Sequence, residues 1–250
     1  MQDRSEIELT RQGAVDDRRF FLVGDDNSMV SVVRIGPLLE IVPEYRRETA
    51  GGTITLSFPD GSLVEAPVEF GDPIDVSFAG LALRVKPVTG PFSEAISDHC
   101  GVGLRLVERP DHRPGVDRGS IAGASLLGVG SLRRLEDAAA DAGQPGEIDC
   151  RRFRMTFGVD GIGPHEEDDW IGREVEIGGA RVKVRERVGR CAATTRDPEA
   201  GKVDLKTLHH ISSYREDVHS EEPLPFGVYA SIEKPGTVRL GDPVTAAPWP

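Results

Sequence analysis

Residues 175–184, which read VEIGGARVKV, decide the fold class of this chain. Apolar and polar residues alternate on both sides of the Gly178-Gly179 pair, which is the period of a strand with one buried face. Glycine accepts the positive φ that a two-residue hairpin turn requires, so the stretch predicts two antiparallel strands. Such hairpins are the units of barrels and sandwiches.

Outward from this hairpin, the same pattern recurs along the chain. We predict further hairpins at 20–33, at 54–58 with the turn that follows it, and at 228–240. Helical spacing is rarer and predicts short helices at 131–142, 204–215 and 92–100. Asp204 is a suitable N-cap for the second of these. The sequence therefore predicts a mostly β fold with two β-barrel-like lobes and a few short helices.

Composition excludes several classes of function. The chain has 250 residues with 29 glycines, 18 prolines and a net charge of -12. We expect no nucleic-acid partner, because a binder must neutralise phosphates. We also expect no membrane partner, because no apolar run approaches the roughly 20 residues of a membrane span. The polar start at 1–8 does not resemble a signal peptide, and three cysteines without a CxxC pair make a poor disulfide framework. We therefore expect a cytoplasmic protein.

Two polar runs could carry chemistry. Residues 165–169, His-Glu-Glu-Asp-Asp, lack the second histidine of the HExxH zinc pattern, and we interpret them as a solvated loop before Trp170. His209 and His210 stand side by side in a helical segment, so their rings face different sides, and we expect one to be half-buried and the other exposed. Neither run predicts a metal site.

Cys191 is the stronger candidate. It follows Arg190 and lies four residues after Arg187, and nearby cations favour the thiolate, which is both a nucleophile and a soft-metal ligand. It also stands between a strand-like run and a polar turn, a position suited to the mouth of a barrel. We therefore expect it in a solvent-reachable cavity between the lobes. Cys100 and Cys150 carry no such signal, and we interpret them as small buried apolar residues.

Around Cys191, an ordered series of motifs resembles the MOSC family, the C-terminal domain of molybdenum cofactor sulfurases. Arg190-Cys191 and Thr194-Thr195 are followed by Asp197-Pro198 and Gly201, and the series continues with the segments 214–215, 226–229, 236–238 and 241–244. Upstream, 152–154, 167–170 and 177–178 are similar to the stretch that precedes the cysteine, and 17–20 and 97–107 resemble the family's N-terminal barrel and its junction. Within the family, this series of motifs is most similar to that of the amidoxime-reducing members, which include mitochondrial and bacterial proteins.

The resemblance implies two β-barrel-like domains, which we place at 1–90 and 121–250 with a junction at 91–120. It also implies a molybdenum cofactor, in which a pterin dithiolene (molybdopterin) holds the metal. Cys191 would be the catalytic cysteine and the protein's metal ligand. Arg18, Arg152 and Arg190 would be cofactor contacts, since a guanidinium binds phosphate through two parallel hydrogen bonds.

The sequence departs from the family pattern at three cofactor contacts. The stretch Ser5–Leu9 carries no Lys-Ser pair, Met155-Thr156 replaces Pro-Asn after the Arg-Phe-Arg motif, and 120–123 lacks the usual polar groups. Losing several charge-assisted contacts weakens binding strongly. We therefore expect the molybdenum cofactor to bind weakly, if at all.

Three functions remain open. The first is a molybdenum oxidoreductase that reduces N-hydroxylated or N-oxide compounds, with a small-molecule substrate and a separate electron donor. The second is a sulfur carrier or sulfurtransferase, in which Cys191 holds a persulfide received from a cysteine desulfurase. The third is a non-catalytic module that binds an anionic, pterin-like ligand.

Overall fold

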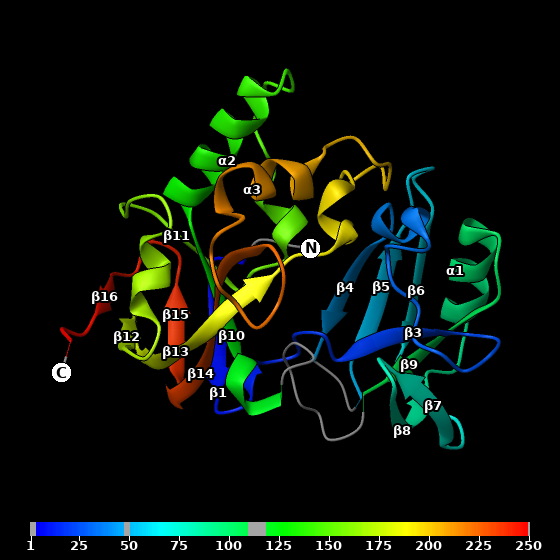
Figure 1. Ribbon diagram of the computed structural model, residues 1–250. Coiled ribbons are helices and arrows are strands. Elements are labelled where there is room, and N and C mark those ends of the chain that lie inside the picture. Colours follow the sequence, from blue (N-terminus) through cyan, green and yellow to red (C-terminus); the bar gives the residue numbers. More distant parts are fainter. Residues whose placement is uncertain (1–3, 48–50, 110–118, 250) are drawn as a thin grey trace. The chain divides into compact units, whose positions relative to one another are not determined.

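The computed structural model describes residues 4–47, 51–109 and 119–249, with side chains from 121 onward in the last range. Packing divides the chain into two compact units, shown in Figure 1. Unit 1 comprises residues 1–17, 114–195 and 204–250, and unit 2 comprises 18–113 and 196–203. The domain division at 1–90, 91–120 and 121–250 stays a prediction. Among the described residues, no helix is long and apolar enough to cross a membrane.

Unit 1 is built on a six-stranded sheet in the order β11-β10-β14-β13-β12-β16. Its strands are antiparallel, apart from the parallel pair of β10 and β11. Their bounds are β10 Ala124–Gly128, β11 Phe157–Val159, β12 Glu174–Ile177, β13 Ala180–Gly189, β14 Pro225–Lys234 and β16 Val244–Ala246. The predicted hairpin is confirmed, since Ile177 pairs with Ala180 across the Gly178-Gly179 turn.

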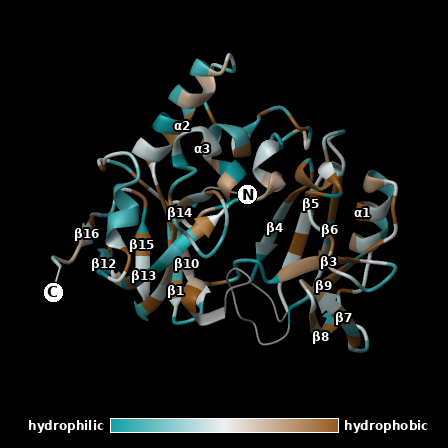
Figure 2. Cartoon of the chain, viewed as in Figure 1, coloured by the Kyte–Doolittle hydropathy of each residue, from teal (hydrophilic) through white to brown (hydrophobic). Residues whose placement is uncertain are grey.

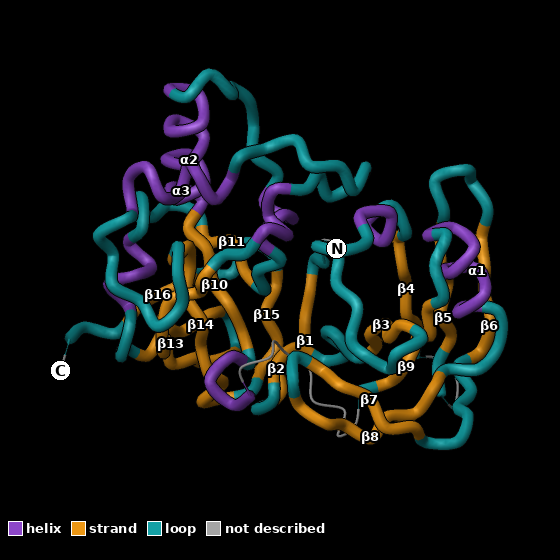
Figure 3. The backbone as a smooth tube through the Cα atoms, turned by 45° about the vertical axis from the view of Figure 1, so that its right-hand side comes forward, coloured by secondary structure: helices purple, strands orange, loops and turns teal. Residues whose placement is uncertain are grey.

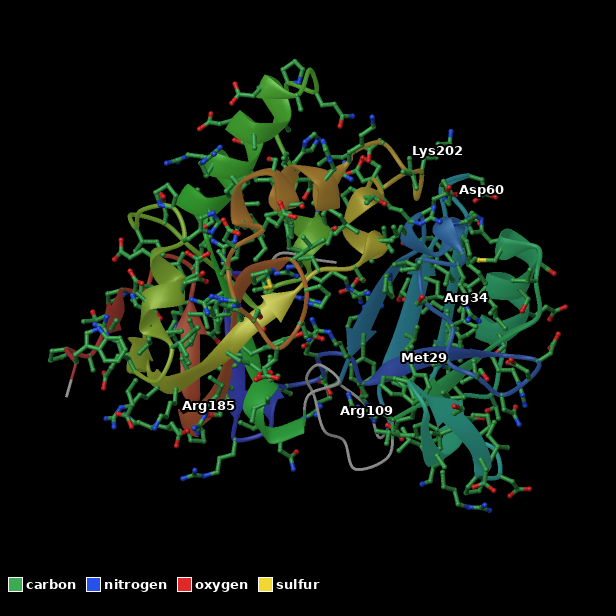
Figure 4. All side chains as sticks on the ribbon, viewed as in Figure 1. Met29, Arg34, Asp60, Arg109, Arg185 and Lys202 are labelled. Carbon is green, nitrogen blue, oxygen red and sulfur yellow. The ribbon has the colours of Figure 1, made fainter. Side chains whose placement is uncertain are left out.

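One face of this sheet is buried because apolar residues alternate along its strands. Val182 and Val184 of β13 are fully buried, whereas Arg181 pairs with Glu174 of β12 and Arg185, labelled in Figure 4, pairs with Glu233 of β14. Figure 2 shows the resulting mixture of hydrophobic and hydrophilic bands on the strands. This alternation sets the register of β13, because a slip of one residue would turn the valines to solvent.

A second, three-stranded sheet completes unit 1 and corrects one prediction. It has the order β15-β1-β2, with β1 Glu6–Thr10, β2 Gly13–Ala14 and β15 Gly236–Arg239. The predicted hairpin at 228–240 is therefore wrong. Both strands exist, but β14 pairs with β10 and β13, and β15 pairs with β1 at the other end of the chain. Long-range pairing has replaced the local turn.

The helices of unit 1 agree with the sequence. Helix α2 covers Val129–Asp141 and α3 covers Thr207–Arg215, and the two pack side by side in Figures 1 and 3. Within the described part of unit 1, short 3₁₀ helices lie between the strands. They are η3 Gly119–Ala122, η4 Cys150–Phe153, η5 Glu166–Trp170 and η6 Ala192–Thr195.

Unit 2 is also mostly β. A four-stranded sheet has the order β3-β9-β8-β7, and a three-stranded sheet has the order β4-β5-β6. The bounds are β3 Phe20–Gly24, β4 Val42–Arg46, β5 Thr53–Ser57, β6 Leu63–Pro67, β7 Ile74–Phe78, β8 Leu81–Pro87 and β9 Leu104–Glu108. Helix α1, Phe92–Cys100, ends at Gly101 as predicted, and η1 covers Gly36–Leu39.

Two predictions in unit 2 have different outcomes. The hairpin of β5 and β6 is confirmed, with Asp60 in its turn (Figure 4). The hairpin at 20–33 is wrong, because Met29 makes only an isolated bridge to Val23 and residues 32–34 form a turn. Local pairing stops at Val30, whose N–H donates to the Leu22 carbonyl, and the Met29 N–H donates to the Ser77 carbonyl of β7. The linker predicted at 110–115 lies outside the described residues.

Candidate functional site

Cys191 lies two residues after the end of β13. The strand ends at Gly189, and the thiol-bearing residue is exposed to solvent, as the sequence predicted. The chain then enters η6, and after Thr195 it passes into the unit 2 segment 196–203, which carries Lys202 in Figure 4, before it returns at Asp204. Cys191 therefore stands at a strand end, where a fixed sheet presents its side chain.

The backbone of Cys191 is held by η6. Its carbonyl oxygen accepts hydrogen bonds from the Thr194 N–H at 3.2 Å and from the Thr194 hydroxyl at 3.0 Å. The Thr194 carbonyl in turn accepts a hydrogen bond from the hydroxyl of Thr207, at 2.8 Å. Both threonines are buried, with exposed fractions of 4% and 0%. Buried polar groups that are all paired fix the conformation of a turn.

Arg190 turns inward while Cys191 faces solvent. Its guanidinium donates to the Phe226 carbonyl from Nε at 2.8 Å and from Nη2, and to the Phe153 carbonyl from Nη1 at 3.0 Å. Nη2 also donates to the Met155 sulfur at 2.9 Å, and the guanidinium lies over the Phe153 ring. Arg190 therefore joins the end of β13 to the beginning of β14, to the end of η4 and to Met155 after it.

The charge of Arg190 has only neutral partners in the part of the chain that the structure describes. Burial lowers its pKa to about 10, so the guanidinium still carries its proton at neutral pH. A buried cation without a carboxylate is costly, and it leaves a fixed positive charge beside Cys191. The proposed contact to a cofactor stays a prediction, but most of the donors of Arg190 are already used within the protein.

Arg152 also has a protein partner. Its guanidinium binds the Asp204 carboxylate through two hydrogen bonds of 2.8 and 2.6 Å, and its side chain is only 7% exposed. The sequence predicted that Asp204 caps α3, and this prediction is wrong. The N-cap is Lys206, with no side-chain hydrogen bond, because Asp204 is engaged by Arg152, 52 residues earlier in the chain.

Arg187 shares a carboxylate with a second arginine. It binds Asp168 at 2.9 Å, and Arg215 binds the same carboxylate oxygen at 2.6 Å. The Arg187 side chain therefore binds η5, and its charge is partly offset there by Asp168. Arg18 belongs to unit 2, and its role as a cofactor contact stays a prediction.

The acidic run 165–169 is not a solvated loop. It contributes η5, in which Glu167 is fully buried and accepts hydrogen bonds from the Ser131 hydroxyl at 2.7 and 2.9 Å. Burial raises the pKa of Glu167. The Ser131 oxygen also accepts the His165 N–H, so the run anchors the first turn of α2. No group of three potential ligands among His, Cys, Asp and Glu occurs within the described ranges.

The burial predicted for the other two cysteines is not fully met, whereas the prediction that the two histidine rings face different sides is met. Cys150 is exposed rather than buried, because η4 presents it to solvent, and Cys100 is half-buried. Burial raises the pKa of Cys100. His210 is buried and His209 is exposed, which confirms that the two rings face different sides.

Comparison with known proteins identifies the family. The sequence model of the MOSC domain matches residues 125–245, which contain Cys191. Mitochondrial amidoxime-reducing component 1 of Xenopus laevis is 33% identical over 259 residues, which covers 94% of this chain and 73% of that protein. The chain belongs to the MOSC family.

Other relatives match a shorter part of the MOSC protein. Mitochondrial amidoxime reducing component 2 of Homo sapiens is 40% identical over 105 residues, and component 1 of Mus musculus is 39% identical over 103 residues. Each match covers 39% of this chain and 30% of the relative. Thus the matched segment spans less than a third of these mammalian relatives.

Two solved structures show a weak likeness to the MOSC protein. YiiM from Geobacillus stearothermophilus has a TM-score of 0.36 at 14% identity, over 52% of this chain and 56% of that one. The YUAD protein from Bacillus subtilis has a TM-score of 0.34 at 13% identity, over 98% of both chains.

The structure adds residues around Cys191 that sequence reasoning missed. Met155, noted only as a departure from the family pattern, supplies a sulfur acceptor to Arg190. Its neighbour Thr156 accepts the Ser125 N–H at 3.1 Å. Thr207 had no signal in the sequence, because its partner lies 13 residues away across a chain excursion.

Proposed function

We propose that this MOSC protein is a molybdenum-cofactor-dependent oxidoreductase that reduces N-hydroxylated or N-oxide compounds. The observation that carries the proposal is Cys191, an exposed thiol at the end of β13 within the matched MOSC segment. The relatives that the chain matches, including one aligned over 94% of this chain, are named amidoxime-reducing components. We extend that activity to this chain, with a small-molecule substrate, a separate electron donor and a cytoplasmic location.

The chemistry of Cys191 fits one role in such a site. A thiolate is a soft ligand and suits a metal that is otherwise held by sulfur atoms of its own organic ligand. An exposed thiol at a strand end lets the metal approach without unfolding the turn behind it. When bound, the cofactor would supply the redox chemistry, and the chain would supply its position and the surrounding charge.

The proposed cofactor contacts are Arg18, Arg152 and Arg190. Because Arg190 donates to carbonyl groups of the protein, its proposed contribution is its positive charge rather than a direct fork to phosphate. Arg152 is held in place by Asp204, which fixes the direction of its guanidinium. These contacts are fewer than the family pattern provides, which supports the expectation of weak binding.

Metal analysis tests this proposal. The chain and its Cys191→Ser and Cys150→Ser variants are purified from a host that makes the molybdenum cofactor. We expect less than one molybdenum per chain, its loss in Cys191→Ser and its retention in Cys150→Ser, since Cys150 is the matched exposed cysteine of unit 1. Reduction of benzamidoxime by a reduced viologen should follow the metal content. Equal molybdenum in all three proteins would contradict the role of Cys191.

The exposure of Cys191 also favours a second candidate, the sulfur carrier. A thiolate that solvent can reach can attack the outer sulfur of a desulfurase persulfide. The new S–S bond forms on Cys191 and the desulfurase cysteine leaves as a thiolate, so the transfer needs no further oxidant. A protein without molybdenum that gains one sulfane sulfur on Cys191, but not on Cys150, would support this candidate. A protein that gains neither molybdenum nor sulfane sulfur would favour the third function, a module that binds an anionic, pterin-like ligand.

A further inference from the structure

Thr207 is the first residue of α3, and its hydroxyl serves a different element. Threonine near a helix start commonly caps its own helix. Here α3 has no side-chain cap, and the Thr207 hydroxyl donates to the Thr194 carbonyl in η6, at 2.8 Å. Thr207 is completely buried, so no water replaces this hydrogen bond when the hydroxyl is removed.

The partner of Thr207 is the residue that holds Cys191. Thr194 binds the Cys191 carbonyl twice, through its N–H and its hydroxyl. A hydrogen-bond chain therefore runs from the beginning of α3 through Thr194 to the backbone of Cys191. The opposite side of Cys191 is fixed by Arg190 and its carbonyl partners. With both sides held, the Cα–Cβ bond of Cys191 keeps one direction relative to the sheet.

We propose that Thr207 is a positioning residue for Cys191, acting through the hydrogen bond of its hydroxyl to the Thr194 carbonyl. This inference rests on the proposed function of Cys191 as a ligand or sulfur carrier, because a precise direction of the thiol matters only if the thiol does chemistry. Ligands and nucleophiles must be held within a narrow range of geometry, and the residues behind them provide that restraint.

The experiment measures the mobility at position 191. A nitroxide spin label is attached to Cys191 in a Cys100→Ala, Cys150→Ser background, and its spectrum is recorded for four proteins: the parent, Thr207→Val, Thr207→Ser and Thr10→Val. Valine has the shape of threonine without the hydroxyl, and serine keeps the hydroxyl. The control, Thr10, also donates to a carbonyl of unit 1, that of Gly13 at 3.0 Å, but it lies in the hairpin of β1 and β2.

We expect the mobile fraction of the label to rise about two- to tenfold in Thr207→Val, which is the effect of one lost hydrogen bond on a local equilibrium. Thr207→Ser should restore the parent spectrum, and Thr10→Val should not change it. A folded Thr207→Val with the parent spectrum would overturn the proposal, as would an equal rise in Thr207→Ser. If Thr207→Val does not fold, Thr194→Val must show the same rise in the mobile fraction. A folded Thr194→Val without that rise would overturn the proposal.

A second arm separates this inference from the proposed function. The unlabelled chain and Thr207→Val are loaded in the cofactor-producing host, and the rate of amidoxime reduction is divided by the molybdenum content. A lower rate per metal in Thr207→Val, with rescue by Thr207→Ser, supports positioning. If the parent holds no molybdenum, the proposed oxidoreductase fails while the spin-label comparison still decides the role of Thr207.

Discussion

His165 is a residue whose protonation is controlled by its surroundings. Burial and the nearby Arg215 lower its pKa to about 4, although Asp168 opposes the shift. Neither ring nitrogen has a hydrogen-bond partner within the described chain, and the ring lies against Tyr214 and Phe226. Burial raises the pKa of Tyr214 to about 12, so both groups stay neutral near pH 7. The contact between α3 and η5 therefore combines these uncharged rings with the ion pair of Arg215 and Asp168.

This arrangement predicts sensitivity to acid. Below pH 6.5 the unfolded chain protonates His165 while the folded chain does not, so the free energy of unfolding falls as the pH drops from 6.5 to 4. The full loss is up to about 3 kcal/mol. His165→Asn removes the titration and keeps a residue type that tolerates the φ of 61° at this position. Urea unfolding at several pH values should show a shallower pH dependence for His165→Asn than for the parent or for His209→Asn, which changes an exposed ring.

At the scale of elements, the beginning of β14 packs closely against its neighbours. Gly227 has a φ of +84°, and a Cβ there would lie 2.8 Å from the Leu126 carbonyl oxygen and 2.7 Å from Cε of Met155. Phe226 and Val228 on either side are fully buried, and the Phe226 carbonyl accepts hydrogen bonds from Arg190. The approach of β14 to β10 and to the Arg190 site therefore requires glycine at this position.

Gly227→Ala should destabilise the protein by more than backbone strain alone. Gly61 is a matched control, because it has the same φ of +84° with nothing within 4 Å of its Cβ position. We expect about 1 kcal/mol of loss for Gly61→Ala and about 2–4 kcal/mol for Gly227→Ala, since a forced shift of packed backbone adds to the strain. Denaturant unfolding measures the free energy of unfolding of both variants. Equal losses would show that the backbone around Gly227 shifts to admit a Cβ without a further loss of stability.

At the scale of the whole molecule, the first strand of the chain belongs to the unit that contains Cys191. β1 pairs with β15, and Leu9 is buried in the core of unit 1 with Val182 and Val228. The chain passes into unit 2 and back, and it makes a second excursion at 196–203. Unit 1 is therefore assembled from three separate segments, and its stability depends on contacts between distant parts of the sequence.

Leu9→Ala tests this dependence. The change removes a side chain that is 1% exposed, and a buried leucine replaced by alanine costs about 2–5 kcal/mol. Leu63→Ala changes a leucine that is 67% exposed and should alter the free energy of unfolding by no more than about 0.5 kcal/mol. Denaturant unfolding followed by the fluorescence of Trp170, which lies in the same core as Leu9, reports on unit 1. A small effect of Leu9→Ala would show that β1 is dispensable.

The sequence by itself determined the local features of this protein. The Gly178-Gly179 hairpin, the helices α1, α2 and α3 and the exposed Cys191 at a strand end all follow from interactions between residues close in the chain. The motif around Cys191 was equally local, which is why it indicated the MOSC family before the fold was known. Turn chemistry and periodicity act over a few residues, so they can be read without the rest of the molecule.

Only the tertiary structure decided which distant groups meet. The pairing of β15 with β1, the burial of Glu167 and the exposure of Cys150 each contradicted or escaped a local pattern. The carbonyl partners of Arg190 and the bond from Thr207 to Thr194 join residues 13 to 37 positions apart. These contacts depend on how the strands and helices pack, because a buried donor takes the acceptor that packing brings within reach.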